Sequence, residues 1–456
     1  MKQKIFLFIL VILSVIISFV DLSLSNIFFH KPVFMGLISF VFFLFISVVF
    51  FKYKNFLIEK KDKILIGLII MTPQLKALNI GFLDLLDIFI VFFLFLYLID
   101  IIRNERPVMH FSTFHFFLIC IFLSATISVI NGGLPSLILL LRIGKSVFYF
   151  FLLCSLVCKK ERFIWAVKAL FCTLGISAII SILQEIIFLT SGFVLVGNVS
   201  NKTISLMFEP TSFGLILRSP AFFGAPQNFA NLLSFSIPIL FLLTFFDKSF
   251  NLNKTLMQAI LFLLLIALFL TYSRGAWIGT MAGTLCGLIL IKRKYLFHII
   301  TICLVILILA ISTNTIEEFT NMVSNQMLFG DLADRIFLAR DSFQRIKNHL
   351  FIGRGLGMGG RYTASVKGWP VHNGFALSFV ETGGLGFFIF LSFFTFLTGK
   401  LIFYCFSFSP ARQIFFIAFL SGIVGYIIDI QFDPFFIGPR FWIIMGILSF
   451  VVENKT

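Results

Sequence analysis

Leu134 to Val157 read LPSLILLLRIGKSVFYFFLLCSLV, and this stretch decides the fold class. Arg142 and Lys145 are its only charged residues. The stretch is long enough to cross the hydrocarbon core of a bilayer, which takes about 20 helical residues. A basic cluster follows at 159–162, as is typical where a transmembrane helix leaves the membrane on the cytoplasmic side. The stretch therefore predicts an integral membrane protein.

The same character extends over the whole chain. Of its 456 residues, 59% are hydrophobic and 12% are charged, whereas about 25% of the residues in a soluble domain are charged. A soluble fold of this length has too little interior for so much apolar surface, so lipid must be the solvent for most of it. The net charge of +16 comes from short basic clusters between apolar segments, which argues against a nucleic-acid partner.

The apolar segments predict an all-α, polytopic membrane bundle of about 14 transmembrane helices, with 12–14 as the range. Basic clusters follow the even-numbered segments, and the positive-inside rule then places both termini in the cytoplasm. We treat 1–456 as one integral membrane domain. Pro73 and Lys76 interrupt the third segment. The fourteen segments are 5–20, 33–51, 64–80, 83–102, 111–130, 134–157, 163–190, 227–246, 255–271, 276–291, 295–313, 374–398, 413–430 and 436–452.

Two of the connections predicted on the outer side are long, at 191–226 and 314–373. The second contains DLADRIFLARDSFQRIKNHL, from Asp331 to Leu350, in which apolar residues recur every three or four positions. This spacing predicts an amphipathic helix that lies along the membrane interface.

Three residues near the predicted outer helix ends are candidates for chemistry. Arg218 precedes the eighth segment, Arg274 lies in the turn between the ninth and tenth, and His372 opens the twelfth. Each also has an ordinary explanation: a solvated loop residue, a snorkelling or capping cation, and a structural histidine. Together, on one side of the membrane and beside Gly, Ser or Pro, they suit a pyrophosphate. Arginine matches phosphate oxygens with a planar fork of donors, and histidine is suited to proton transfer.

Three more charged residues lie deeper in the predicted bundle. Arg142 and Lys145 share one helix face, with Arg142 about 12 Å from the outer end. They either line a cavity for a lipid phosphate or form structural ion pairs. Glu381 lies about two and a half turns beyond His372, and it either contacts substrate or pairs with one of the cations.

Metal and nucleotide motifs are weak in this chain. It contains neither Asp-x-Asp nor HExxH, so we expect no metal site, and we expect no cofactor. GRGLGMGG, from Gly353 to Gly360, follows no predicted strand and sits in no βαβ unit. We therefore interpret it as a flexible turn.

Four short segments resemble the O-antigen ligase and polymerase family of bacterial envelope glycosyltransferases. They are the stretch from Arg218 to Asn228, TYSRGAWIG at 271–279, the stretch from Arg335 to GRGLG at 353–357, and HNG at 372–374 with ETGGLG at 381–386. The similarity covers about 218–390, which the resemblance makes the ligase-related core. Each motif is short, but their order and topology are fairly specific. The chain departs from several ligases of the family in its number of predicted spans.

The resemblance implies a C-type (GT-C-like) membrane glycosyltransferase that works without metal. Its donor would be a glycan on undecaprenyl pyrophosphate, with Arg218 and Arg274 binding the pyrophosphate and His372 activating the acceptor hydroxyl. Arg335 would be a substrate contact. The acceptor would be lipid A core or a growing glycan, and membrane lipid would surround the site. The reaction would take place on the periplasmic face of the bacterial inner membrane.

Three functions stay open at this point. The first is an O-antigen ligase in lipopolysaccharide biosynthesis, and the second is a polymerase of O-antigen or capsule repeat units, which shares the donor. The third is a flippase or transporter of lipid-linked oligosaccharides. A transporter favours internal repeats and charges along a path between both faces, whereas the candidate residues gather on one side.

Overall fold

The computed structural model describes most of the second half of the chain and part of the first. The described ranges are 60–72, 112–191, 214–221, 225–247, 253–292, 346–358, 373–432 and 437–453, with short pieces at 79–80, 83–84, 90, 208–211, 223, 340 and 344.

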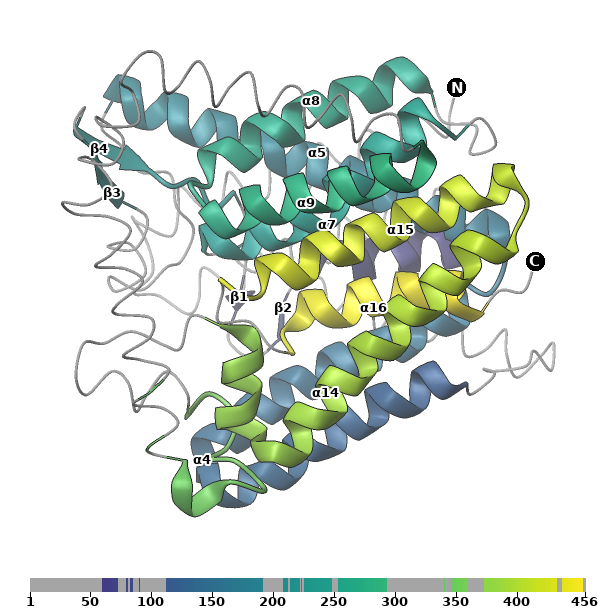
Figure 1. The fold of residues 1–456 in the computed structure, drawn as a ribbon. Helices are drawn as coiled ribbons and strands as arrows, with labels where there is room; N and C mark the ends of the chain where they lie inside the picture. The colour runs from purple at the N-terminus through teal and green to yellow at the C-terminus, as the bar shows by residue number, and fades with distance from the viewer. Residues whose placement is uncertain are drawn as a thin grey trace, which may run out of the picture. The chain divides into compact units, whose positions relative to one another are not determined.

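Long apolar helices make up almost all of the described structure (Figure 1). Six of those described are long and apolar enough to cross a membrane, as a polytopic membrane protein requires. Nine of the predicted segments coincide with helices or helix halves wherever the structure describes them: the three from 111–130 to 163–190, the three from 227–246 to 276–291, and the three from 374–398 to 436–452. The helices are α4 (Thr113–Leu156), α5 (Lys160–Ser191), α7 (Pro226–Phe245), α8 (Lys254–Leu270), α9 (Arg274–Ile291), α14 (Gly374–Ser407), α15 (Pro410–Asp429) and α16 (Pro439–Glu453).

The predicted third segment differs from the structure in its second half. Residues 60–71 are helical, but 79–80 form strand β1 (Asn79–Ile80), which pairs antiparallel with β2 (Leu83–Asp84). Pro73 explains the early end of the helix, because proline disfavours helical geometry in the residue before it. A second hairpin joins β3 (Phe208–Thr211) to β4 (Gly214–Leu217), so two short hairpins accompany the helices. The predicted segments 5–20, 33–51 and 295–313 lie outside the described residues, as do most of 83–102 and the predicted interfacial helix.

The chain divides into two compact units. The first comprises 1–108, 156–229 and 269–272. In it, polar contacts join the helix at 60–71 to the start of α5. Arg162 forms an ion pair with Asp62, and Trp165 Nε1–H donates to the Lys63 carbonyl at 2.8 Å. Lys63 Nζ also lies 5.9 Å from the centre of the Trp165 ring. These contacts fix the basic end of α5.

The second unit comprises 109–155, 230–268 and 273–456, and its centre is the close packing of α9 on α15 (Figure 1). Glycines recur every four residues along one face of α9, at 275, 279, 283 and 287. A Cβ at Gly279 would lie 2.5 Å from the Gly425 carbonyl oxygen of α15. In lipid, helices associate through such close backbone contacts rather than through a hydrophobic driving force.

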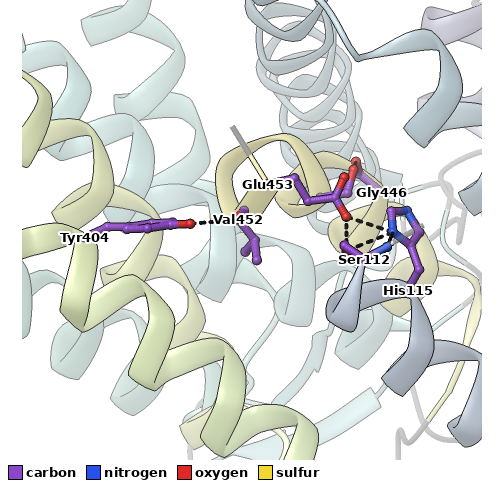
Figure 2. Close-up of polar contacts among 7 residues, drawn as sticks. Ser112, His115, Tyr404, Gly446, Val452 and Glu453 are labelled. Atoms are coloured by element: carbon purple, nitrogen blue, oxygen red, sulfur yellow. Dashed lines mark hydrogen bonds and ion pairs between the residues drawn. The ribbon is translucent and has the colours of Figure 1, made fainter. Parts of the chain in front are cut away.

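A polar cluster ties the start of α4 to the end of α16 within the second unit. Figure 2 shows Ser112, His115 and Glu453 converging there. His115 Nδ1 lies 2.7 Å from Glu453 Oε1, and the Ser112 hydroxyl donates to the same carboxylate. His115 is fully buried, so the carboxylate compensates the burial of its polar ring.

Two glycine kinks give the second unit its irregular backbone. Gly133 (φ 63°, ψ −154°) divides α4, and Gly383 (φ 69°, ψ −171°) divides α14. These φ/ψ values belong to a region that is essentially restricted to glycine. The kink in α4 falls between the predicted segments 111–130 and 134–157, which confirms them as separate helices.

The loop at 350–358 packs into both kinks and is not a flexible turn, contrary to the sequence prediction. The Arg354 and Gly355 amides donate to the Val380 and Glu381 carbonyls at 2.9 and 3.0 Å. Across the kink in α14, the Gly384 amide donates to the Leu350 carbonyl at 2.7 Å. On the α4 side, Ser136 Oγ–H donates to the Leu356 carbonyl at 2.7 Å. Glycine at 353, 355 and 357 adopts positive φ, so the glycines shape a packed loop.

Candidate functional site

Arg274 is the first residue of α9, and its side chain is exposed. The turn before it contains Tyr272 with φ 50°, an unusual value for a residue other than glycine. After it, Gly275 lies against Phe432, where a Cβ would be 2.5 Å from the Phe432 Cβ atom. The guanidinium therefore projects from a helix N-terminus whose backbone is held against the residues that follow α15. A helix N-terminus and an arginine both favour an anion.

The turn that follows α15, at 430–432, also holds the start of α14. The Gly374 amide donates to the Ile430 carbonyl at 2.7 Å. The Asn373 side-chain Nδ2 donates to the main-chain oxygen of Gln431 at 3.2 Å and to its Oε1 at 3.1 Å. Asn373 Oδ1 caps α14 by accepting from the Ala376 amide at 2.9 Å. One short turn thus contacts the first residues of both α9 and α14.

His372 lies outside the described residues, as does Arg335. The peptide bond nevertheless ties His372 to Asn373, which the 430–432 turn holds in place.

Arg218 lies in the first unit, directly after β4, and its side chain is half-buried. Its Nε–H donates to the Thr271 carbonyl at 3.2 Å, and the Ser219 amide donates to the Leu270 carbonyl at 3.1 Å. Ser219 Oγ–H in turn donates to Gln184 Oε1 of α5 at 2.6 Å. Arg218 is thus fixed to the turn that leads into Arg274.

Glu381 is buried next to the kink in α14 and takes part in the packing of the 350–358 loop. Its Oε1 accepts the Gly357 amide at 2.9 Å. Sequence reasoning placed Glu381 among the substrate contacts, and the structure gives it a contact within the chain.

Arg142 and Lys145 lie in the second half of α4, the first exposed and the second half-buried. Both belong to one uninterrupted helical stretch after Gly133, so their spacing puts them on a common face, as predicted. Their role at a lipid phosphate stays a prediction.

Two buried charged residues escaped sequence reasoning, Asp429 and Arg440. Asp429 is fully buried at the end of α15 and accepts from Asn231 Nδ2 and Ser234 Oγ, each at 3.0 Å. Arg440 is buried in the first turn of α16. The sequence could have pointed to both, because a charged residue inside a predicted membrane span costs free energy and is usually functional. Asn373 and Gln431 were missed because neutral amides give no comparable signal.

The sequence from α8 to the long second segment of α14 matches a known family. Residues 259–391 match the family model described as O-antigen ligase. This segment is therefore similar to an O-antigen ligase domain, and residues 259–391 are called the ligase domain below. It contains Arg274, Arg335, His372 and Glu381, whereas Arg218, Arg142 and Lys145 lie outside it. A search of curated proteins found no match to the chain.

The ligase domain gives the site a chemical context. The match supports a membrane enzyme of the O-antigen ligase type. Both of its helix starts, at Arg274 and beside His372, are fixed by the 430–432 turn, which lies beyond the matched segment. The chain outside the ligase domain therefore helps to build the candidate site.

Proposed function

We propose that this chain is a glycosyltransferase of surface polysaccharide biosynthesis that transfers a glycan from undecaprenyl pyrophosphate to an acceptor hydroxyl. We assign it a ligase-like role, with lipid A core as acceptor, on the periplasmic face of the bacterial inner membrane. In this proposal the bundle has about 14 helices in a GT-C-like arrangement, both termini are cytoplasmic, and the chemistry uses no metal. The core of the enzyme spans 218–390.

One observation supports this proposal more than any other. The 430–432 turn contacts Gly275, next to Arg274, and also Asn373 and Gly374, which follow His372 in the sequence. Arg218 bonds to the turn that precedes Arg274. Transfer requires that the groups binding the leaving pyrophosphate and the group activating the acceptor stand close together, since the reacting atoms must approach to about 3–3.5 Å.

The proposed mechanism follows from the charges. The acceptor oxygen attacks the anomeric carbon, the bond from that carbon to the pyrophosphate oxygen breaks, and undecaprenyl pyrophosphate leaves with the electron pair. His372 accepts the proton of the acceptor hydroxyl. Negative charge grows on the leaving oxygen, where Arg218 and Arg274 stabilise it with preorganised donors in place of water. Substrate binding around this centre is assigned to four further residues, Arg335, Arg142, Lys145 and Glu381.

The test is substitution of the two central residues within the ligase domain. Arg274→Ala should lower transfer by about 10²–10³-fold, the usual effect of removing one preorganised donor, and His372→Ala should abolish it. Arg412→Ala is the matched control, because Arg412 is an exposed arginine in the first turn of α15. Surface polysaccharide is measured in a deletion strain complemented with each variant, alongside the amount of chain in the membrane. Full surface polysaccharide with His372→Ala would refute the proposal.

A polymerase of repeat units has the same donor chemistry, and the family match supports that type of function as well. The deletion strain separates the two. Loss of a ligase leaves bare lipid A core, whereas loss of a polymerase leaves core capped with a single repeat unit. Lipid A core capped with a single repeat unit in the deletion strain would show that the chain is a polymerase and not a ligase.

A further inference from the structure

The contacts of Gln431 single it out among the residues around the candidate site. It is half-buried, lies two positions after the end of α15, and uses both ends of its side-chain amide. Its Nε2–H donates to the Ile427 carbonyl at 3.1 Å, in the last turn of α15. Its Oε1 accepts from Asn373 Nδ2 at 3.1 Å. These two partners fix which end of the amide faces Asn373.

The amide contacts form a continuous path from α15 to α14. The first hydrogen bond joins Ile427 to Gln431, and the second joins Gln431 to Asn373. The third joins Asn373 Oδ1 to the Ala376 amide in the first turn of α14. The Gln431 main-chain oxygen and the Ile430 carbonyl add two more contacts to the same helix start. The next residue, Phe432, packs on Gly275 beside Arg274. The path therefore ends at Asn373, the residue after His372, on one side and at Gly275, the residue after Arg274, on the other.

We infer that Gln431 is a positioning residue, which holds the Asn373 amide and with it the start of α14, directly after His372 in the sequence, in a fixed place relative to the start of α9 at Arg274. This inference rests on the proposed function and adds a residue from outside the ligase domain to it. Gln431 touches neither the donor nor the acceptor in this assignment. It acts on the rate of transfer, because a displacement of about 1 Å at a reacting group lowers rates by about 10²-fold.

The side chain of Gln431 can be removed without removing its main-chain contact. Gln431→Met keeps the length and loses both amide contacts, and it should lower transfer about tenfold, since the main-chain oxygen of residue 431 still accepts from Asn373. Gln431→Glu keeps an acceptor for Asn373 and should recover most of the loss. Gln413→Met, the same change at the opposite end of α15, is the matched control and should transfer like the wild type.

Asn373 supplies the second arm of a double-mutant cycle. Asn373→Ser keeps a good N-cap residue but is too short to reach Gln431. If the two side chains act through one contact, the double variant should be no slower than the slower single variant. Additive losses would mean that Gln431 acts elsewhere, and they would overturn the inference.

A binding measurement separates positioning from general damage. The probe is undecaprenyl pyrophosphate added to the full-length protein in detergent, with the rise in unfolding temperature as readout. Gln431→Met and His372→Ala should keep the wild-type rise, whereas Arg274→Ala should lose it. Loss of the rise in Gln431→Met would show that the residue supports the fold or the binding of the donor, and would overturn the inference.

The outcomes distinguish the inference from the proposed function. If His372→Ala transfers normally, the proposed function fails and the inference fails with it. If His372→Ala is inactive while Gln431→Met transfers like the wild type, the inference alone fails. If Gln431→Met is slow, keeps its response to undecaprenyl pyrophosphate and is rescued by Gln431→Glu, the inference stands.

Discussion

Replacing Gly383 by alanine should loosen the 350–358 loop from the kink in α14, and the structure sets the size of the effect. The φ/ψ values of Gly383 belong to a region that costs other residues about 1–3 kcal/mol. A Cβ there would lie 2.5 Å from the Gly353 amide nitrogen, so the loop must also move. Movement breaks the hydrogen bonds of the Gly384 and Leu385 amides to the loop, each contributing about 0.5–1.5 kcal/mol.

These contributions add to about 2–6 kcal/mol of local stability. Since each 1.4 kcal/mol changes an equilibrium constant tenfold, the amides of the loop and kink should exchange with solvent at least about 30-fold faster. Hydrogen exchange measured by mass spectrometry on peptides covering 351–358 and 379–386 reports this opening directly. The detergent-solubilised, full-length protein is used throughout.

Two other glycines separate backbone strain from steric clash. Gly133 shares the unusual backbone region, but a Cβ there would meet nothing within 4 Å, so Gly133→Ala should show the strain alone, about 1–3 kcal/mol. Gly399 is exposed in α14, has no positive φ and would place a Cβ in open space. Gly399→Ala should therefore be neutral or slightly stabilising. Exchange in Gly383→Ala no faster than in Gly133→Ala would refute the argument that the loop is packed into the kink.

Three more predictions concern the second unit. Gly275→Ala should force Phe432 away from α9 and lower transfer at least tenfold with wild-type amounts of protein in the membrane, measured against Gly399→Ala by surface polysaccharide. Asp429→Leu should destabilise the bundle by about 2 kcal/mol or more, because Asn231 and Ser234 lose their buried acceptor, and a lower unfolding temperature in detergent tests this. Glu453→Ala should lower the same temperature by leaving the buried His115 without its carboxylate partner, whereas Lys254→Ala, an exposed change, should not.

Hydrophobic patterning predicted the helices of this chain well, because in a membrane the length of an apolar run fixes where a helix can lie. Segments such as 163–190 and 276–291 agree with α5 and α9 to within a few residues. The third segment was predicted less well, since hydropathy averages over Pro73 while the backbone does not. The kink at Gly383 was also missed, because glycine is common in transmembrane helices and its backbone conformation leaves no signal in hydropathy.

The candidate site shows a different division between what sequence predicts and what it does not. Arg218, Arg274 and His372 were chosen as candidates because a charge near a span is costly and therefore informative, and their roles stay a prediction. Glu381 has the same signal but bonds to the Gly357 amide, so charge alone did not separate a packing role from a binding role. The glycines of α9 and the amide of Gln431 depend on which helices are neighbours, and one helix's sequence does not contain that information.

The residues proposed for chemistry and the residues that position them lie in different parts of the chain. Arg274 is the first residue of α9 and His372 precedes the start of α14 in the sequence, both within the ligase domain, whereas the turn that holds these two helix starts, at 430–432, lies about 40 residues beyond its end. A side chain at a helix start is positioned only as accurately as the backbone of that helix start is held. Because transfer depends on displacements of about 1 Å, the residues that hold the backbone affect the rate of transfer. Changes in the 430–432 turn that leave every charged residue of the ligase domain intact should therefore alter transfer. Gln431→Met tests that claim, with Gln413→Met near the start of α15 as its control.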